Sequence, residues 1–287
     1  MATQQRTVAT PNRDIHKVAL NTERHVVEGL LQKGVSASER LLRCVSDLSP
    51  PKLKGSVVTS LAPQSTRASL DLDDTSPAAD HSLAPMEWTS IGHFGKTEAW
   101  SRSAAGEVFM TRGRVLIRPE EMGGHGGLEV DDVMAYLWDS NNLKVYDPLV
   151  EKVCKVSDVP VPTGDDTKMD VSYIADYSPF IGIPGRDYGC LRHYSRRVGG
   201  SGDHQVQSIT GLELPYESET HFRGEILLVG FECRKLDDGT LQIAYVEQVD
   251  VRSSVPEWMQ QPLKTRHVAL LDTIKQKLIE AKTASGA

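Results

Sequence analysis

The sequence predicts an α+β protein in which a curved antiparallel β-sheet wraps around a long C-terminal helix. Between residues 98 and 251, short segments with the alternation of β-strands recur, and turn residues separate them. Residues 263–282 then place apolar side chains at helical spacing on one face. A long antiparallel sheet has to bury one face, and the amphipathic helix is its natural cover. The space between them is either packed core or a ligand cavity, and periodicity alone leaves both open.

The expected strands lie on either side of a pair of helices. The helix predicted over 128–138 begins with Asp131 and Asp132 in its first turn, where carboxylates interact favourably with the helix dipole, and a short helix follows over 141–146. Asp237-Asp238-Gly239 predicts a tight hairpin turn between the last two strands. Strands are expected at 98–101, 107–117, 151–156, 169–175, 188–198, 204–214, 222–235 and 241–251.

A further helical pattern near the N-terminus is interrupted once. Apolar residues from Val26 to Leu31 share one face, Gly34 breaks the pattern, and the capping-box spacing of residues 36–39 restarts it. We therefore expect two short helices or one broken helix, which ends at Pro50-Pro51 because neither proline can donate a helical hydrogen bond.

The chain divides into four parts on these patterns. Residues 1–21 are a polar, flexible tail, and 22–49 form the helical segment, either the first helix of the domain or an N-terminal extension. Residues 50–85 are rich in Ser, Pro, Asp and Ala and contain no aromatic residue. Such a segment buries too little apolar area to offset its ordering entropy, which predicts a disordered linker. Residues 86–287 are expected to form the main α+β domain.

Composition excludes several classes of function. The net charge of −7 provides no basic field, so we expect no nucleic-acid partner. No apolar run is long enough to span a bilayer, and the polar N-terminus does not resemble a signal peptide, so a cytoplasmic protein is expected. The four cysteines form no C-x-x-C pair, and the glycine-rich loop at 123–127 lacks a phosphate-binding context. We expect neither a metal nor another cofactor.

Several short motifs occur in a specific order: Trp138-Asp139, the run from Pro184 to Arg192, Phe222-Arg223, Asp250 and Pro256-Glu257-Trp258. Together they resemble the START domain, the lipid-binding module named after steroidogenic acute regulatory protein. The resemblance spans about residues 86–284. It implies a helix-grip fold, with a tunnel that holds one lipid and a carrier that associates transiently with membranes. Arg186-Asp187-Tyr188, and Pro256 two residues before Trp258, resemble the phosphatidylcholine-transfer-like branch, although Ser253 stands where the family usually has glycine.

The resemblance also suggests which residues meet the lipid. Arg192 matches a family arginine that points inward and meets either a lipid headgroup or an acidic partner. In the sterol-binding branch that partner lies on the preceding strand, where an ungapped alignment places Tyr173, with Asp170 and Asp176 nearby. Because a tyrosine and not an acid stands at the aligned position, a lipid phosphate is favoured as the partner of Arg192. An arginine can bind a phosphate bidentately. A glycerophospholipid is therefore preferred over a sterol or ceramide, while a structural ion pair at Arg192 stays open.

Other residues are assigned to lipid or membrane contact with less specificity. Tyrosines are included because aromatic rings attract a quaternary ammonium head. The remaining predicted lipid contacts are Tyr173, Tyr194, Arg223, Tyr245, Leu271, Ile274 and Leu278. The other face of the last helix is basic and could sit on an anionic membrane or simply be solvated. The predicted membrane contacts on it are Lys264, Arg266 and Lys275.

Three functions are consistent with this sequence. The first is a non-enzymatic carrier that moves one lipid between membranes. The second is an enzyme of the wider helix-grip superfamily, such as an aromatase or cyclase, which needs an acid–base pair in the cavity. The third is a regulatory adaptor in which lipid occupancy controls a protein partner bound through residues 1–85.

Overall fold

The computed structural model describes residues 24–48, 87–104, 106–122, 127–161, 166–180, 182–199, 202–215, 218–252 and 257–285. The predicted tail (1–21), the predicted linker (50–85), most of the glycine-rich loop, Ser253 and Pro256 lie outside these ranges.

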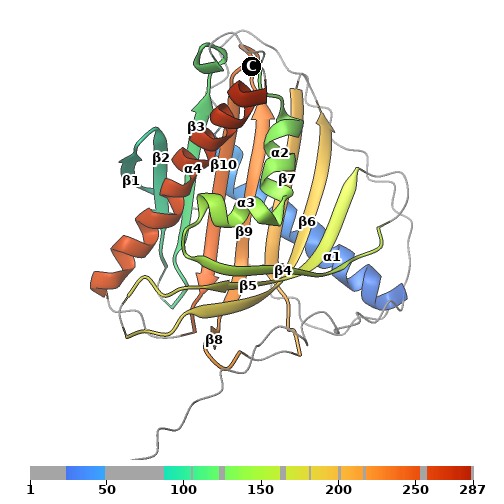
Figure 1. Ribbon diagram of the computed structural model, residues 1–287, viewed down its shortest axis with the longest axis vertical. Helices are drawn as coiled ribbons and strands as arrows, with labels where there is room; N and C mark the ends of the chain where they lie inside the picture. The colour runs from blue at the N-terminus through green and yellow to red at the C-terminus, as the bar shows by residue number, and fades with distance from the viewer. Residues whose placement is uncertain are drawn as a thin grey trace, which may run out of the picture.

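One antiparallel sheet of ten strands forms the centre of the protein (Figure 1). Its order is β1-β2-β3-β10-β9-β7-β6-β5-β4, and the short β8 pairs in parallel with β6. The strands are β1 (Thr89–Phe94), β2 (Thr97–Arg102), β3 (Met110–Ile117), β4 (Val150–Asp158), β5 (Thr167–Asp176), β6 (Arg186–Gly199), β7 (Gly202–Gly211), β8 (Phe222–Arg223), β9 (Glu225–Lys235) and β10 (Leu241–Asp250).

The predicted strands are present, with two differences. The edge strand β1 was not predicted; half of its residues are exposed, and its register shifts between Ser90 and Gly92. The segment 222–235 is two strands rather than one, because the chain divides at Gly224. A side chain there would place Cβ 2.4 Å from the ring of Tyr188. The hairpin predicted at Asp237-Asp238-Gly239 is confirmed, and Gly239 has the positive φ of 81° that such a turn requires.

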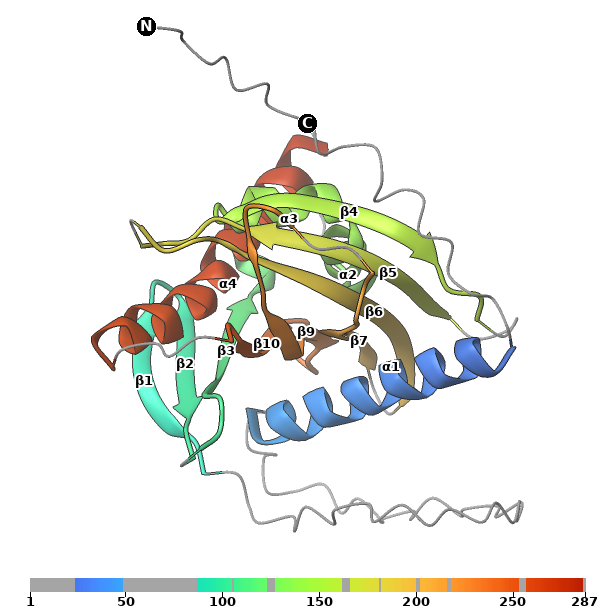
Figure 2. The same cartoon turned by 90° about the horizontal axis from the view of Figure 1, so that it is seen from below.

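The N-terminal helix α1 (Arg24–Val45) packs on the convex face of the sheet, against β6, β7, β9 and β10 (Figure 2). The predicted interruption at Gly34 is wrong, since α1 continues through it and ends in a 3-10 turn, η2 (Ser46–Leu48). Gly34 instead allows close approach, because a Cβ at this position would lie 2.9 Å from the Cβ of His193. The glycine lowers helix propensity and permits the helix to contact β6.

Three helices lie on the concave face of the sheet (Figures 1 and 2). They are α2 (Val130–Trp138), α3 (Ser140–Tyr146) and α4 (Glu257–Ser285), and a 3-10 turn η3 (Pro119–Met122) follows β3. Asp139 separates α2 from α3, because its carboxylate accepts the Asn141 backbone N–H at 2.9 Å and caps the second helix.

The main core lies between α2, α4 and the central strands. Val133, Met134, Leu271 and Ile274 are almost fully buried there. At Gly113 of β3, an added Cβ would lie 2.3 Å from Val268, so the glycine lets α4 pack directly on the backbone of the sheet. This close packing holds the middle of α4 against β3, within the same turns that border the cavity described next.

Candidate functional site

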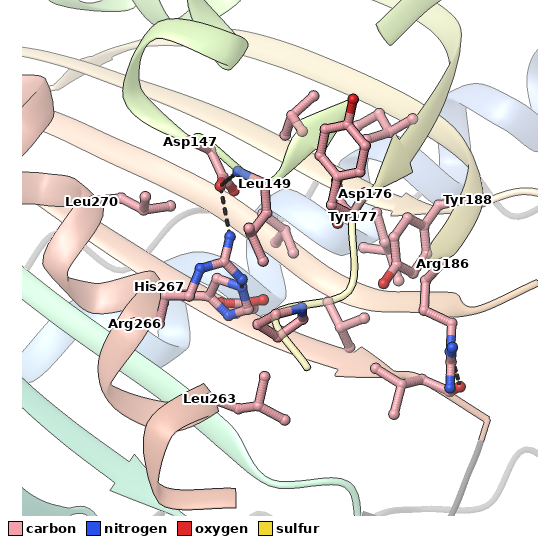
Figure 3. A pocket seen from close by; sticks show the side chains of 18 of the residues that line it. Asp147, Leu149, Asp176, Tyr177, Arg186, Tyr188, Leu263, Arg266, His267 and Leu270 are labelled. Carbon is pink, nitrogen blue, oxygen red and sulfur yellow. Dashed lines mark hydrogen bonds and ion pairs between the residues drawn. The ribbon is translucent and has the colours of Figure 1, made fainter. Parts of the chain in front are cut away.

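A cavity of about 210 Å³ lies between the concave face of the sheet, α3, the first half of α4 and the loop that joins β5 to β6 (Figure 3). Strand alternation produces it, because every second side chain of β5, β6, β9 and β10 faces inward. Most of its wall is apolar and includes Ile174, Ile209, Ile226, Val229, Phe231 and Leu270.

Two ion pairs tie α4 to the polar side of this cavity. Arg266 Nη2 donates a hydrogen bond to Asp147 Oδ1 at 2.7 Å, and Figure 3 draws this contact. His267 Nδ1 lies 2.6 Å from Glu247 of β10, which also accepts the Tyr245 hydroxyl at 3.2 Å. Burial acts to lower the pKa of His267, but the Glu247 carboxylate outweighs it, so the pKa lies above its ordinary value.

Asp176 is a further carboxyl group on this wall, and no role was predicted for it from the sequence. It is the last residue of β5, in register with Val150 on one side and Arg186 on the other. Within the described chain, its Oδ1 is buried and has no hydrogen-bond partner. Burial, followed by the negative charge of Asp147, raises the pKa of Asp176 to about 7. A lone acid in sequence gives no sign of this, since the effect depends on which strands surround it.

Arg192 lies beside a second, more polar pocket of about 720 Å³ between α2, α3 and strands β4 to β6. Its Nε and Nη2 donate to the two carboxylate oxygens of Asp170 at 2.7 and 2.5 Å, and its Nη1 donates to the Trp138 carbonyl at 3.0 Å. Both side chains are almost completely buried. All three nitrogens of the guanidinium group therefore donate to protein acceptors.

This geometry corrects the predicted alignment. The β5–β6 register places Asp170, not Tyr173, opposite Arg192. An offset of three residues reverses the face of a strand, so the ungapped alignment selected a side chain on the wrong side of the sheet. Arg192 has the acid–arginine pair that we expected to be missing, and it is not available as a free phosphate ligand.

Tyr173 and Arg223, two predicted lipid contacts, line neither pocket. The Tyr173 hydroxyl donates to Asp187 at 3.1 Å, and Nε of Arg223 donates to the same carboxylate at 2.9 Å. This network lies on the convex face, because Asp187 alternates with the cavity residue Tyr188. Their contacts connect β5, β6 and β8 instead.

The other predicted lipid contacts divide between the two pockets and the core. Tyr245 lines the apolar cavity, whereas Tyr194 lines the polar pocket and donates to Gln205 at 2.7 Å. The apolar stripe of α4 that we expected to touch lipid is packed core, because it faces α2 and the central strands. Its members are Leu271, Ile274 and Leu278. The helix contributes earlier residues to the cavity: Leu263, Arg266, His267 and Leu270.

Two of the three predicted membrane-contact residues of α4 are held in ion pairs. Arg266 points to Asp147, and Lys275 is only 6% exposed and donates to Glu121 at 2.7 Å. Lys264 is half-buried over the ring of Phe109. The sequence shows these cations only as charges on one face of a helix. In the folded protein, Arg266 and Lys275 form ion pairs with carboxylates.

Exposed apolar side chains gather instead where the β5–β6 loop meets the cavity. Tyr177 and Ile183 of this loop are 55% and 38% exposed and also line the cavity. Phe222 is 62% exposed, and its ring centre lies 5.5 Å from the guanidinium carbon of Arg186, another lining residue. Large apolar groups that remain exposed together indicate a contact surface.

Across the described ranges, no helix combines the length and apolar character needed to cross a bilayer. The same ranges contain no cluster of three histidine, cysteine or acidic side chains suited to a metal ion.

A curved antiparallel sheet that grips a C-terminal helix around an apolar cavity is a helix-grip fold. Among solved structures, human StAR-related lipid transfer protein 5 has a TM-score of 0.60 at 15% identity, over 88% of this chain and 98% of its own. The lipid transfer and protein localization domain of human StarD13 has a TM-score of 0.53 at 12% identity, over 67% and 89% of the two chains. Human STARD10 has a TM-score of 0.52 at 15% identity, over 69% and 75%.

The chain therefore has the START-type helix-grip fold, as the sequence motifs predicted. No protein-family model and no curated protein sequence matches it. The three structures do not support the predicted lean to the phosphatidylcholine-transfer-like branch.

Proposed function

We propose that this protein is a non-enzymatic carrier that binds one lipid in the apolar cavity beneath α4 and moves it between membranes. The cavity is the observation that carries the proposal, because most of its wall is apolar and a small number of charged side chains interrupt it. A lipid methylene transferred from water to such a wall gains about 0.8 kcal/mol. The shared fold with proteins described as lipid transfer proteins supports the same function.

The polar groups favour a lipid with a small neutral head over the glycerophospholipid predicted from sequence. That prediction depended on a free Arg192, which is paired with Asp170. Among the described residues of the cavity wall, both arginines are also engaged: Arg266 with Asp147, and Arg186 with the Val251 carbonyl at 2.8 Å. A phosphate would have to displace one of these bonds.

Membrane contact is assigned to the apolar rim of the cavity rather than to the basic side of α4. Tyr177, Ile183 and Phe222 are exposed beside the cavity, whereas Arg266 and Lys275 are held in ion pairs. A tyrosine suits the membrane–water interface because its body is apolar and its tip polar, and exposed phenylalanine and isoleucine side chains can insert below it. Insertion of this rim would bring the cavity to the lipid without a basic helix face.

Native mass spectrometry of the purified full chain tests the proposal. We expect the mass of one bound lipid, identified after denaturation, and exchange of that lipid with vesicles. A sterol or another neutral lipid would agree with the cavity chemistry, while a glycerophospholipid would keep the carrier and contradict the preferred head. An apo mass after incubation with mixed vesicles would contradict the carrier itself. Conversion of a cyclic or polyketide-like compound would favour the enzyme alternative.

The adaptor alternative needs a narrower truncation than removal of residues 1–85. Leu41 and Cys44 of α1 are fully buried against the sheet, so loss of the whole segment would expose core. Deletion of residues 1–21 alone leaves this helix in place. Lipid exchange that survives this deletion, together with loss of a cellular function, would favour an adaptor.

A further inference from the structure

We propose that the Asp176 carboxyl is the polar anchor of the cavity and hydrogen-bonds a hydroxyl group of the bound lipid. This inference rests on the proposed function, since it requires a lipid in the apolar cavity. The ligand class it assigns is a compact hydrocarbon with one free hydroxyl, such as a sterol alcohol.

The position of Asp176 is the first reason. It ends β5 on the same face as Ile174 and forms part of the cavity wall near Tyr188 of β6. Its Oδ1 is buried and has no hydrogen-bond partner among the described residues. A buried acceptor without a partner is unfavourable, and a ligand hydroxyl would supply the missing bond.

The neighbouring charged groups are the second reason, because they are already engaged. Asp147 accepts from Arg266, and Glu247 contacts both His267 and the Tyr245 hydroxyl. Arg186 lies opposite Asp176 in the β-ladder, yet its Nε donates to the Val251 carbonyl and its Nη1 to the Pro184 carbonyl. Of the charged side chains on the described part of this wall, Asp176 alone has a buried polar atom without a partner.

The protonation state of Asp176 selects a hydroxyl over other head groups. Burial and the nearby carboxylates of Asp147 and Glu247 raise its pKa to about 7, against the opposing charges of His267 and Arg266. Both forms are therefore populated near neutral pH. A hydroxyl accepts from the protonated acid and donates to the carboxylate, so it bonds to either form. A carbonyl bonds only to the acid, and an ammonium group favours the carboxylate.

A pair of matched probes tests this assignment in the full chain. We would measure binding of a fluorescent sterol with a free hydroxyl and of its methyl ether, which keeps the hydrocarbon and loses the donor. The wild type should prefer the alcohol by about tenfold, the size expected for one buried hydrogen bond. Asp176→Leu should abolish that preference, and Asp176→Asn should retain most of it because the amide both donates and accepts.

Asp158→Asn is the matched control, since it removes an exposed carboxylate at the far end of β4 and should bind both probes like the wild type. Thermal unfolding of each variant verifies that it is folded, and Asp176→Ala replaces the leucine variant if needed. An unchanged preference in a folded Asp176→Leu protein would overturn the anchor and leave the carrier intact. Failure of the wild type to bind either sterol, or any co-purified lipid, would overturn the carrier and the anchor together.

The pH dependence separates a hydroxyl from a cationic head. Affinity for the sterol alcohol should change less than about twofold between pH 6 and 8, because both forms of Asp176 can bond to it. A long-chain alkylammonium probe should instead bind more tightly as Asp176 ionises. Preference for that probe over the sterol alcohol above pH 7 would refute the hydroxyl assignment in favour of an ion pair.

Discussion

Replacement of Asp170 by leucine should destabilise the protein strongly, because it would leave the Arg192 guanidinium buried without its counter-charge. The two oxygens of Asp170 accept bonds of 2.7 and 2.5 Å from Arg192, and the two side chains are 2% and 7% exposed. Leucine has a similar volume and cannot accept these bonds. The remaining hydrogen-bond acceptor of Arg192, the Trp138 carbonyl, satisfies only one nitrogen.

The expected magnitude follows from the burial of this pair. Removal of one member of a buried ion pair costs about 3–5 kcal/mol, which is a large part of the ~5–15 kcal/mol that stabilises a typical domain. At about 2–4 °C per kcal/mol for a domain of ~150–250 residues, Asp170→Leu should lower Tm by about 6–20 °C. The double variant Asp170→Leu/Arg192→Met should recover most of this loss, since an apolar pair leaves no buried charge.

Urea unfolding and calorimetry of the two single variants and the double variant measure this coupling as a double-mutant cycle. Asp158→Asn serves as the control, because its exposed contact with Lys155 is worth less than about 0.5 kcal/mol. A loss below about 1 kcal/mol in Asp170→Leu, or simple additivity in the double variant, would refute the buried pair. Arg192 would then be available for a lipid phosphate.

Three further predictions concern the cavity acid, the seat of α4 and the apolar rim. The raised pKa means that folded Asp176 keeps its proton after the unfolded chain has lost it, so wild-type stability falls as the pH rises from 3.8 to about 7. Asp176→Asn should therefore gain about 2–4 kcal/mol over the wild type at pH 8 and nothing below pH ~4, as denaturant titrations at both pH values would show. Gly113→Ala should lower the free energy of unfolding by about 1–3 kcal/mol, because the new Cβ would collide with Val268. An unchanged Tm would contradict the close packing of α4 on β3. Phe222→Ser with Tyr177→Ser should reduce partition to neutral phosphatidylcholine vesicles several-fold while Tm stays within a few degrees, and unchanged partition would assign membrane contact to another surface.

The sequence was sufficient to predict those features that depend on a single strand or a single turn. Period-2 alternation predicted most strands, and Asp237-Asp238-Gly239 predicted the β9–β10 turn because a positive φ is a local requirement. The cap at Asp139 likewise depends on residues that are neighbours in the chain. The helix-grip fold follows from the order of such local elements together with the START motifs.

Prediction failed where the outcome depends on partners distant in sequence. Gly34 looked like a helix break because the sequence does not show why a glycine is needed there. The need comes from the close approach of His193, which lies far along the chain. Lys275 looked like surface charge because Glu121, its partner, is brought to it only by folding. The apolar stripe of α4 was correctly predicted to be buried. Periodicity does not say which turns of the helix face the core and which line the cavity.

The two acids of β5 show how register separates a structural role from a ligand role. Asp170 and Asp176 are six residues apart and therefore lie on the same face of the strand, about 20 Å from one another. The ladder places Arg192 opposite the first, and their bonds neutralise both charges. It places Arg186 opposite the second, but that guanidinium turns to backbone carbonyls instead. Residue type alone makes the two acids equivalent, and only the second retains an unfilled hydrogen bond, which it presents to an apolar cavity.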